Sequence, residues 1–185
     1  DTLEGAILRL HEPVDKGMAL KFGDSPCEDK SCGYVTVLKD GDIYHMYYRG
    51  LYTDAITRLG TYCYARSEDG IHWVKPNLGI CEFKGSKENN IILVGGDGTH
   101  SFSPFIDFNP EAKQEERFKA MGLQLTPDKK RWVLLAFVSP DGIHWKKLQD
   151  EPVLTEGAFD SQNVSFWSVS EEKYVCYYRT KSKGQ

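Results

Sequence analysis

A seven-residue motif occurs twice in this chain and constrains its fold more than any other feature. Residues Ser67–Trp73 read SEDGIHW, and Ser139–Trp145, 72 positions later, read SPDGIHW, with six of the seven positions identical. A second match relates Tyr44–Arg49 to Tyr174–Arg179, where a pair of tyrosines and an arginine recur. Repeats separated by tens of residues are typical of folds that stack one supersecondary unit several times.

Each repeat lies within strand-like sequence that is rich in β-branched and aromatic residues. The first unit predicts strands at 33–38, 43–49, 59–66 and 72–74. The second predicts strands at 103–108, 118–124, 132–138 and 144–148, and a third begins with 163–167 and 174–179. Helical signals are confined to one or two turns within 110–117, beginning with a proline.

Repeated four-stranded antiparallel units predict an all-β protein with the architecture of a β-propeller. We expect one domain over 1–185, with blade units at about 33–85, 100–150 and 159–185 after an N-terminal extension, 1–32. About two and a half blades cannot close a ring, since propellers have about 4 to 8. The chain is therefore expected to lack C-terminal blades of a longer propeller, or to cover its edge strands as a homo-oligomer.

The repeated motif itself is expected to build turns rather than to bind a ligand. Asp and Gly supply turn chemistry between outer strands, Ser and Asp bond to nearby backbone, and Trp packs over the hairpin. A direct ligand role for Asp69, Asp141 or either tryptophan is the less favoured alternative.

The composition excludes several partners and leaves the compartment open. The net charge of −4, from 23 basic and 27 acidic side chains, argues against nucleic acid as a partner. No apolar run approaches the roughly 20 residues of a membrane helix, so no membrane partner is expected. Five cysteines, an odd number, argue against a fully paired disulfide framework, although Cys27 and Cys32 are close enough to bridge a loop. No cysteines or histidines have the spacing of a zinc site, and no signal peptide is visible. The compartment stays open, and secretion or the periplasm are the options considered.

The innermost strand of each blade is where site residues are sought. In the second unit, residues 100–107 supply His100 and Asp107, and in the third, residues 159–163 supply Asp160, Gln162 and Asn163. Polar groups at the mouth of a packed strand are typical of a ligand site. Asp160 is the leading candidate for a catalytic or sugar-binding carboxylate and Asp107 the second. The alternatives are a strand-capping turn for Asp160 and an Asx turn for Asp107.

Two arginines and several aromatic residues complete the candidates. Arg49 and Arg179 follow paired tyrosines, and each can orient a substrate or a catalytic aspartate, or form a structural ion pair, which is favoured. His100 is a candidate sugar contact or metal ligand, although a loop histidine is more often neither. One or two aromatic side chains are expected to stack on sugar, while most fill the space between blades: Tyr47, Tyr48, Tyr177, Tyr178 and Trp167.

Four segments carry a resemblance to a known protein group. Ser67–Trp73, Lys75–Gly79, Asn89–Ile91 and Ala158–Asn163 resemble bacterial proteins of the glycoside hydrolase family 32-like group, which belong with family 43 to the five-bladed propeller glycosidases. The resemblance runs from about Leu8 to Arg179. It implies catalytic carboxylates on the inner strands around the pore, a carbohydrate ligand and no obligatory cofactor, although related propellers can hold calcium near the axis.

The resulting hypothesis is a glycosidase-like protein that hydrolyses or binds a carbohydrate with carboxylates at the propeller axis. Glycoside hydrolysis needs two carboxylates that flank the bond, one of them kept protonated. The chain lacks the Trp-Met-Asn-Asp-Pro, Arg-Asp-Pro and Glu-Cys motifs of family 32. A non-catalytic carbohydrate-binding or structural propeller therefore stays open as the alternative. A sialidase-like enzyme ranks last, because the spacing of the heptapeptide differs from an Asp-box by one residue.

Overall fold

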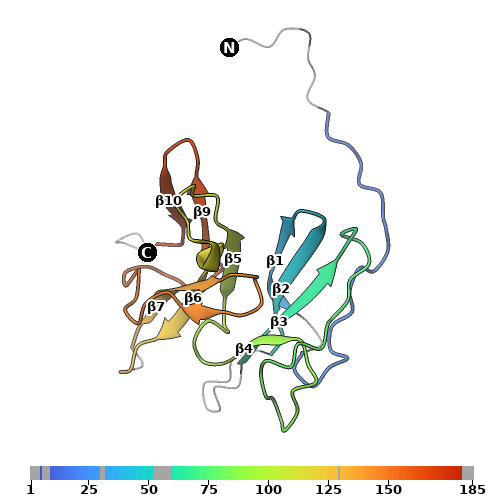
Figure 1. The fold of residues 1–185 in the computed structure, drawn as a ribbon, viewed down its shortest axis with the longest axis horizontal. Helices are drawn as coiled ribbons and strands as arrows, with labels where there is room; N and C mark the ends of the chain where they lie inside the picture. Colours follow the sequence, from blue (N-terminus) through green and yellow to red (C-terminus); the bar gives the residue numbers. More distant parts are fainter. Residues whose placement is uncertain (1–4, 6–8, 30–31, 52–59, 129, 181–185) are drawn as a thin grey trace.

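The computed structural model describes residues 5, 9–29, 32–51, 60–128 and 130–180, and it contains two four-stranded antiparallel sheets (Figure 1). The first sheet has the strand order β1-β2-β3-β4, with the bounds β1 Gly33–Asp40, β2 Ile43–Arg49, β3 Gly60–Ser67 and β4 Ile91–Gly95. The second has the order β5-β6-β7-β8, with the bounds β5 Phe102–Ile106, β6 Phe118–Leu125, β7 Trp132–Ser139 and β8 Lys146–Lys147.

A two-stranded hairpin follows the second sheet. It consists of β9 Val164–Ser168 and β10 Lys173–Tyr177, and the one helical turn among the described residues is η1 Gln114–Glu116. The predicted fold is confirmed: the chain is an all-β propeller with two complete blades and the inner half of a third. The inner strands β1, β5 and β9 lie next to one another in that order.

Both copies of the heptapeptide fold into the same turn, as the sequence predicts. In the first, Ser67 Oγ accepts hydrogen bonds from the backbone N–H groups of Asp69 and Gly70. Asp69 Oδ1 accepts from the next two N–H groups, and the Trp73 indole donates to the Gly70 carbonyl over 3.1 Å. The same bonds recur in the second copy.

The outer edge of the first sheet differs from the prediction of a short strand at 72–74. Val74 makes a single bridge to Arg66, and the chain then leaves the sheet and returns as β4, which pairs with β3. Pro76 explains the departure, because proline has no N–H to continue the ladder. The first sheet consequently runs on to Gly95, beyond residue 85, where the first blade unit was expected to end.

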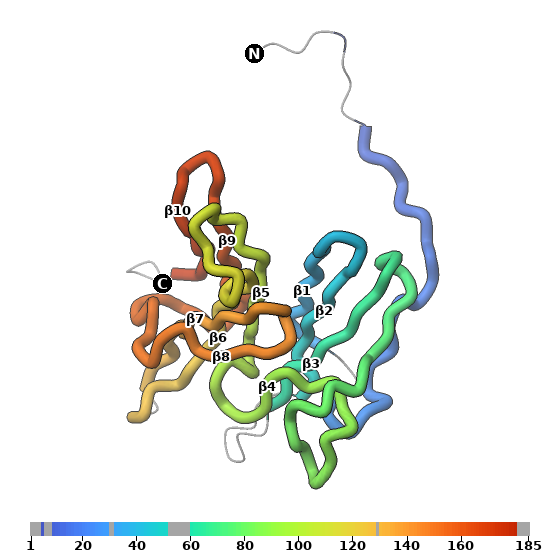
Figure 2. The backbone as a smooth tube through the Cα atoms, in the orientation of Figure 1, coloured from blue at the N-terminus to red at the C-terminus, as the bar shows by residue number. Residues whose placement is uncertain are grey.

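Three apolar clusters hold these sheets together. The largest lies between the two four-stranded sheets and includes Tyr47, Tyr62, Phe102 and Phe137, with Trp145 packed against it. A second lies on the opposite face of the first sheet, where the N-terminal segment runs along it (Figure 2), and contains Cys27, Tyr48 and Cys63. A third joins the second sheet to the hairpin.

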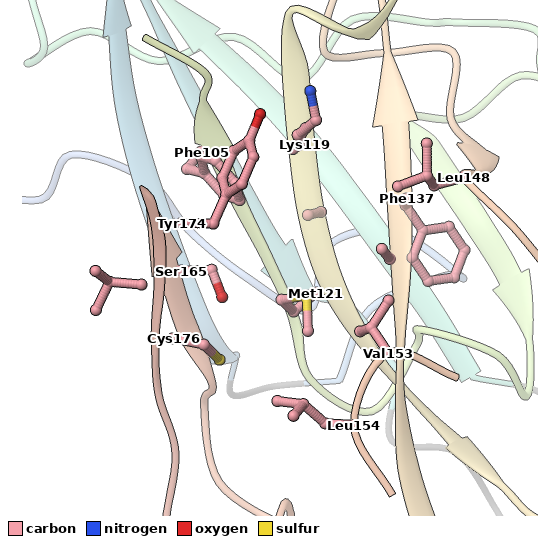
Figure 3. A pocket seen from close by; sticks show the side chains of 13 residues that line it. Phe105, Lys119, Met121, Phe137, Leu148, Val153, Leu154, Ser165, Tyr174 and Cys176 are labelled. Atoms are coloured by element: carbon pink, nitrogen blue, oxygen red, sulfur yellow. The ribbon is translucent and has the colours of Figure 1, made fainter. Parts of the chain in front are cut away.

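An apolar groove of about 390 Å³ separates the second sheet from the β9–β10 hairpin (Figure 3). Met121 and Leu154 line it from one side and Cys176 from the other, and Lys119 is its one charged side chain. A groove with no carboxylate among its lining residues is unsuited to acid–base chemistry on a sugar.

Within the part of the chain that the structure describes, no helix is long and apolar enough to cross a membrane.

Candidate functional site

Three residues at or before the start of an inner strand meet at one end of the sheets, which we call the upstream face. They are Tyr34 in β1, His100 before β5 and Asp160 before β9. The Tyr34 hydroxyl donates to the Asp160 carbonyl over 2.9 Å, and His100 Nε2 lies 3.4 Å from the same oxygen. The rings of Tyr34 and His100 are 5.6 Å apart. Segments 60 or more residues apart in sequence therefore form one cluster, because their inner strands lie next to one another.

Both predicted arginines reach this face at the end of the second strand of a blade: Arg49 is the last residue of β2, and Arg179 lies two residues after β10. Arg49 pairs with Gly33, its guanidinium lies 4.9 Å from the centre of the Tyr34 ring, and its Nη1 donates to the His100 carbonyl over 3.4 Å. The backbone of Arg179 pairs with Ala158, and its guanidinium hydrogen-bonds the Asp160 carboxylate. The repeated Tyr-Tyr-Arg sequence thus delivers a cation to equivalent places in two blades.

Tyr34 is a part of the site that the sequence did not reveal. Its φ of 53° lies in the left-handed region, where residues other than Gly, Asn and Asp are rare, and it occupies an irregularity in the pairing of β1 with β2. Such strain persists where surrounding contacts enforce it, and it is concentrated at functional sites. The Tyr62 hydroxyl bonds to the Tyr34 carbonyl and helps to hold this conformation.

Gln162 and Asn163 fix the loop that carries Asp160. Asn163 is 1% exposed, and its Nδ2 donates to the carbonyls of Phe159 and Ser161, one on each side of Asp160. Gln162 Nε2 donates to Thr36 Oγ1 over 2.8 Å and so ties this loop to β1. In this arrangement both amides position the aspartate.

A groove of about 530 Å³ lies beside Asp160 and contains further side chains that the sequence analysis missed. Trp132 stacks on His100 with ring centres 5.9 Å apart, and Glu156 is a second carboxylate in the same groove. Lys130, Arg131 and Arg179 supply positive charge. Burial lowers the pKa of His100, which favours its neutral form. The groove thus combines an aromatic platform, two carboxylates and several hydrogen-bond donors.

Asp107 lies at the other end of the inner strands. It follows β5, its side chain is fully buried, and Lys119 Nζ lies 2.6 Å from its Oδ2. Its Oδ1 accepts from the Asn109 backbone N–H, which is the Asx turn considered as an alternative. The structure therefore groups Asp160 with His100, Arg49, Arg179 and the two amides, and it separates Asp107 from all of them.

The described residues include no group of three side chains arranged to hold a metal ion. The described cysteines are free thiols.

The propeller fold of this chain is similar to that of solved glycoside hydrolase structures. No family model and no curated protein matches it. One similar solved structure comes from the GH130 family of mannoside phosphorylases, which contains glycoside hydrolases that target β-1,2 mannosidic linkages in Candida mannan. It has a TM-score of 0.53 and 13% identity, over 92% of this chain and 48% of that one. Another, a glycosyl hydrolase from Bacteroides ovatus, has a TM-score of 0.52 and 15% identity, over 90% and 47%.

This chain spans about half the length of the structures that it matches. At such low identity the likeness establishes the fold and not the activity. The glycoside hydrolase propeller fold implied by the sequence resemblance is confirmed. Its finer assignment to families 32 and 43 stays a prediction.

Proposed function

We propose that the upstream face binds a carbohydrate and acts on a glycosidic bond, with Asp160 as the reacting carboxylate. The observation that carries this proposal is the convergence of Tyr34, His100 and Asp160 from three successive inner strands. The fold supports it, because the similar structures come from carbohydrate-active enzymes that are described as acting on glycosides. A volume of about 530 Å³ suits a small saccharide.

Asp160 is suited to the role of base or nucleophile. Its carboxylate is 56% exposed and pairs with Arg179, which is 54% exposed. An exposed ion pair contributes little to stability, so a ligand can replace one partner at small cost. The hydrogen bond from Arg179 also orients the carboxylate.

Glu156 is the candidate for the second carboxylate, in place of Asp107. It lines the same groove as Asp160, whereas the Asp107 side chain is buried in an ion pair. A general acid must lie across the glycosidic bond from the base or nucleophile, which is possible only within one groove. Trp132 offers a flat apolar surface for a sugar ring, and Arg49 and His100 offer polar contacts.

The test is a screen of aryl-glycosides, with and without inorganic phosphate, that includes mannosides and, because of the family 32 resemblance, fructosides. We expect Asp160→Asn to reduce turnover by about 100-fold or more. Asp42→Asn, an exposed aspartate in the β1–β2 turn, is the matched control and should turn over like the wild type.

An inactive wild-type chain that still binds sugar at this groove would favour the non-catalytic alternative. That alternative has one specific support, which is that Asp107 does not join Asp160. Unchanged turnover in Asp160→Asn would refute the assignment of this carboxylate.

A further inference from the structure

A third hollow, of about 420 Å³, lies at the end of the inner strands opposite the upstream face, and we call this end the hairpin face. The connection between β5 and β6 lies beside the β9–β10 hairpin there (Figure 2). The first segment contributes Phe108, Asn109 and Glu111, and the second contributes Trp167, Val169 and Glu172. Phe108 is 69% exposed and Val169 is 72% exposed. An exposed apolar patch rimmed by polar side chains marks a binding surface.

The tryptophan of this hollow is held in place from behind. The rings of Tyr174 and Trp167 make an edge-to-face contact, with centres 4.9 Å apart and an angle of 70° between the rings. The Tyr174 hydroxyl donates to Asp107 Oδ2 over 2.8 Å and accepts from Asn109 Nδ2 over 3.1 Å. The hydroxyl thus links the β9–β10 hairpin to the β5–β6 connection, so both walls of the hollow share one hydrogen-bond network.

Asp107 and Lys119 form the buried base of that network. The Asp107 carboxylate is fully buried and the Lys119 side chain is 14% exposed. Figure 3 shows Lys119 and Tyr174 directed toward the same end of the apolar groove. Burying such a pair brings a desolvation penalty that its own attraction only partly offsets. The role of the pair here is to fix the position of Tyr174 and, through Tyr174, the position of Trp167.

Two carboxylates complete the rim. Glu172 has a φ of 51°, in the left-handed region where glycine or asparagine is usual, at the last position of the β9–β10 turn. Glu111 lies on the opposite wall, and its backbone N–H donates to Asn109 Oδ1 over 3.0 Å, which orders that segment. Backbone strain of this kind is concentrated at ligand sites.

We propose that this hollow is a second carbohydrate-binding site, distinct from the upstream face, which takes a neutral pyranose unit of a glycan chain. A pyranose ring has an apolar C–H face that packs on Trp167 or Phe108, and hydroxyls around its edge that donate to Glu111 and Glu172. Small ligands are commonly bound this way, by aromatic surface and a few fixed polar groups. Asp107 is a positioning residue in this site. The proposal does not depend on activity at Asp160.

The proposal is tested by affinity gel electrophoresis of the full chain in gels that contain yeast mannan, xylan, arabinan, levan or β-glucan. We expect one or more of these polymers to retard the wild type, and Trp167→Ala to weaken the affinity by about tenfold or more. Phe166→Ala is the matched control, because its side chain points to the other side of the same strand and should leave retardation unchanged. Tyr174→Phe keeps the ring and removes the hydroxyl that bonds to Asp107 and Asn109. This variant should weaken the affinity for the polymer less than Trp167→Ala does.

The variant Asp160→Asn distinguishes the two sites. It should lose turnover of aryl-glycosides and should still be retarded by the polymer in the gel. Circular dichroism of every variant establishes that it is folded. The proposal is overturned if no polymer retards the wild type, or if Trp167→Ala is retarded as strongly as the wild type. It is also overturned if Phe166→Ala and Trp167→Ala lose binding equally, because the hairpin as a whole would then be responsible.

Discussion

The two copies of the heptapeptide form the same turn in different surroundings. Within each copy, the serine hydroxyl, the aspartate carboxylate and the indole N–H make matching hydrogen bonds, and His72 and His144 each contact their aspartate, over 2.6 and 2.7 Å. Around the second copy, Trp145 contacts the buried rings of Tyr47 and Phe102 between two sheets. Around the first, Trp73 packs on the cluster that faces the N-terminal segment.

This difference shows that a repeated sequence can specify a local conformation without specifying how much that segment contributes to the stability of the protein. The bonds of the turn span at most three residues, so they form wherever the motif occurs. The burial of the tryptophan and of the glycine depends on which blade lies next to the turn. Matched substitutions in the two copies therefore separate the local contribution from the tertiary one.

The largest contrast is expected for the tryptophans. Trp145→Ala should lower the free energy of unfolding by about 3 kcal/mol, because it opens a cavity between two sheets, while Trp73→Ala should cost about 1 to 2 kcal/mol at the face of one sheet. Urea unfolding of both variants measures the difference. Equal losses would mean that the indole acts through its own turn alone.

The glycines should show somewhat smaller losses of stability, with a contrast of similar size between the two copies. Both have a φ of 75°, but a Cβ on Gly142 would lie 2.4 Å from Tyr47 Oη, whereas a Cβ on Gly70 meets nothing closer than 3.5 Å. Gly142→Ala should therefore cost about 2 to 3 kcal/mol and Gly70→Ala about 1 kcal/mol. Thermal and urea unfolding provide the values.

Tyr47→Phe is the control for this contact. The Tyr47 hydroxyl is buried with no hydrogen-bond partner among the described residues, so its removal alone should cost little. Combined with Gly142→Ala it should restore part of the lost stability. A double variant as unstable as the additive sum would contradict the steric explanation.

The smallest contrast concerns pH. Burial alone would raise the pKa of Asp141, but hydrogen bonds from His144 and Ile143 outweigh it and lower the pKa to about 2. Because the folded pKa is below the unfolded value of about 3.9, this stabilisation is present above pH 4 and is lost as the pH falls toward 2. The side chain is 44% exposed, so we expect no more than about 1 kcal/mol.

Urea unfolding at pH 4.5 and 2.5 measures this effect. The wild type should lose more stability over this interval than Asp141→Asn, which does not titrate at this position. The pKa of Asp69 is also lowered, chiefly by its hydrogen bond to His72, and its side chain is 47% exposed, so Asp69→Asn should change the slope by a similar small amount. A clearly larger change in Asp141→Asn would show that the neighbouring blade adds to the stabilisation of that carboxylate.

Much of the fold could be predicted from short stretches of sequence. The strands β2 and β3, which are rich in aromatic residues, and the turn at Gly41 follow from residues that are adjacent in the chain. The excursion from Val74 to β4 was missed, although Pro76 was a visible signal against a continuous strand.

The candidate site was predictable only in part. The sequence indicated Asp160 and the two arginines, since a repeated Tyr-Tyr-Arg must end equivalent strands at equivalent places. Trp132 and Glu156 were missed because each lies in a segment that reads as strand or loop, with no neighbour to suggest a site. Tyr34 was missed because its left-handed backbone follows from contacts with Tyr62 and Arg49 rather than from its own sequence.

The sequence by itself determined the turns, most of the strands and the ends of strands where arginines occur, because these depend on hydrogen bonds and residue preferences over a few positions. Only the tertiary structure decided which polar groups share a site. Asp107 and Asp160 both flank inner strands, but one follows its strand and the other precedes it. Packing the inner strands side by side therefore carries the two carboxylates to opposite ends of the axis, and no local pattern contains that information.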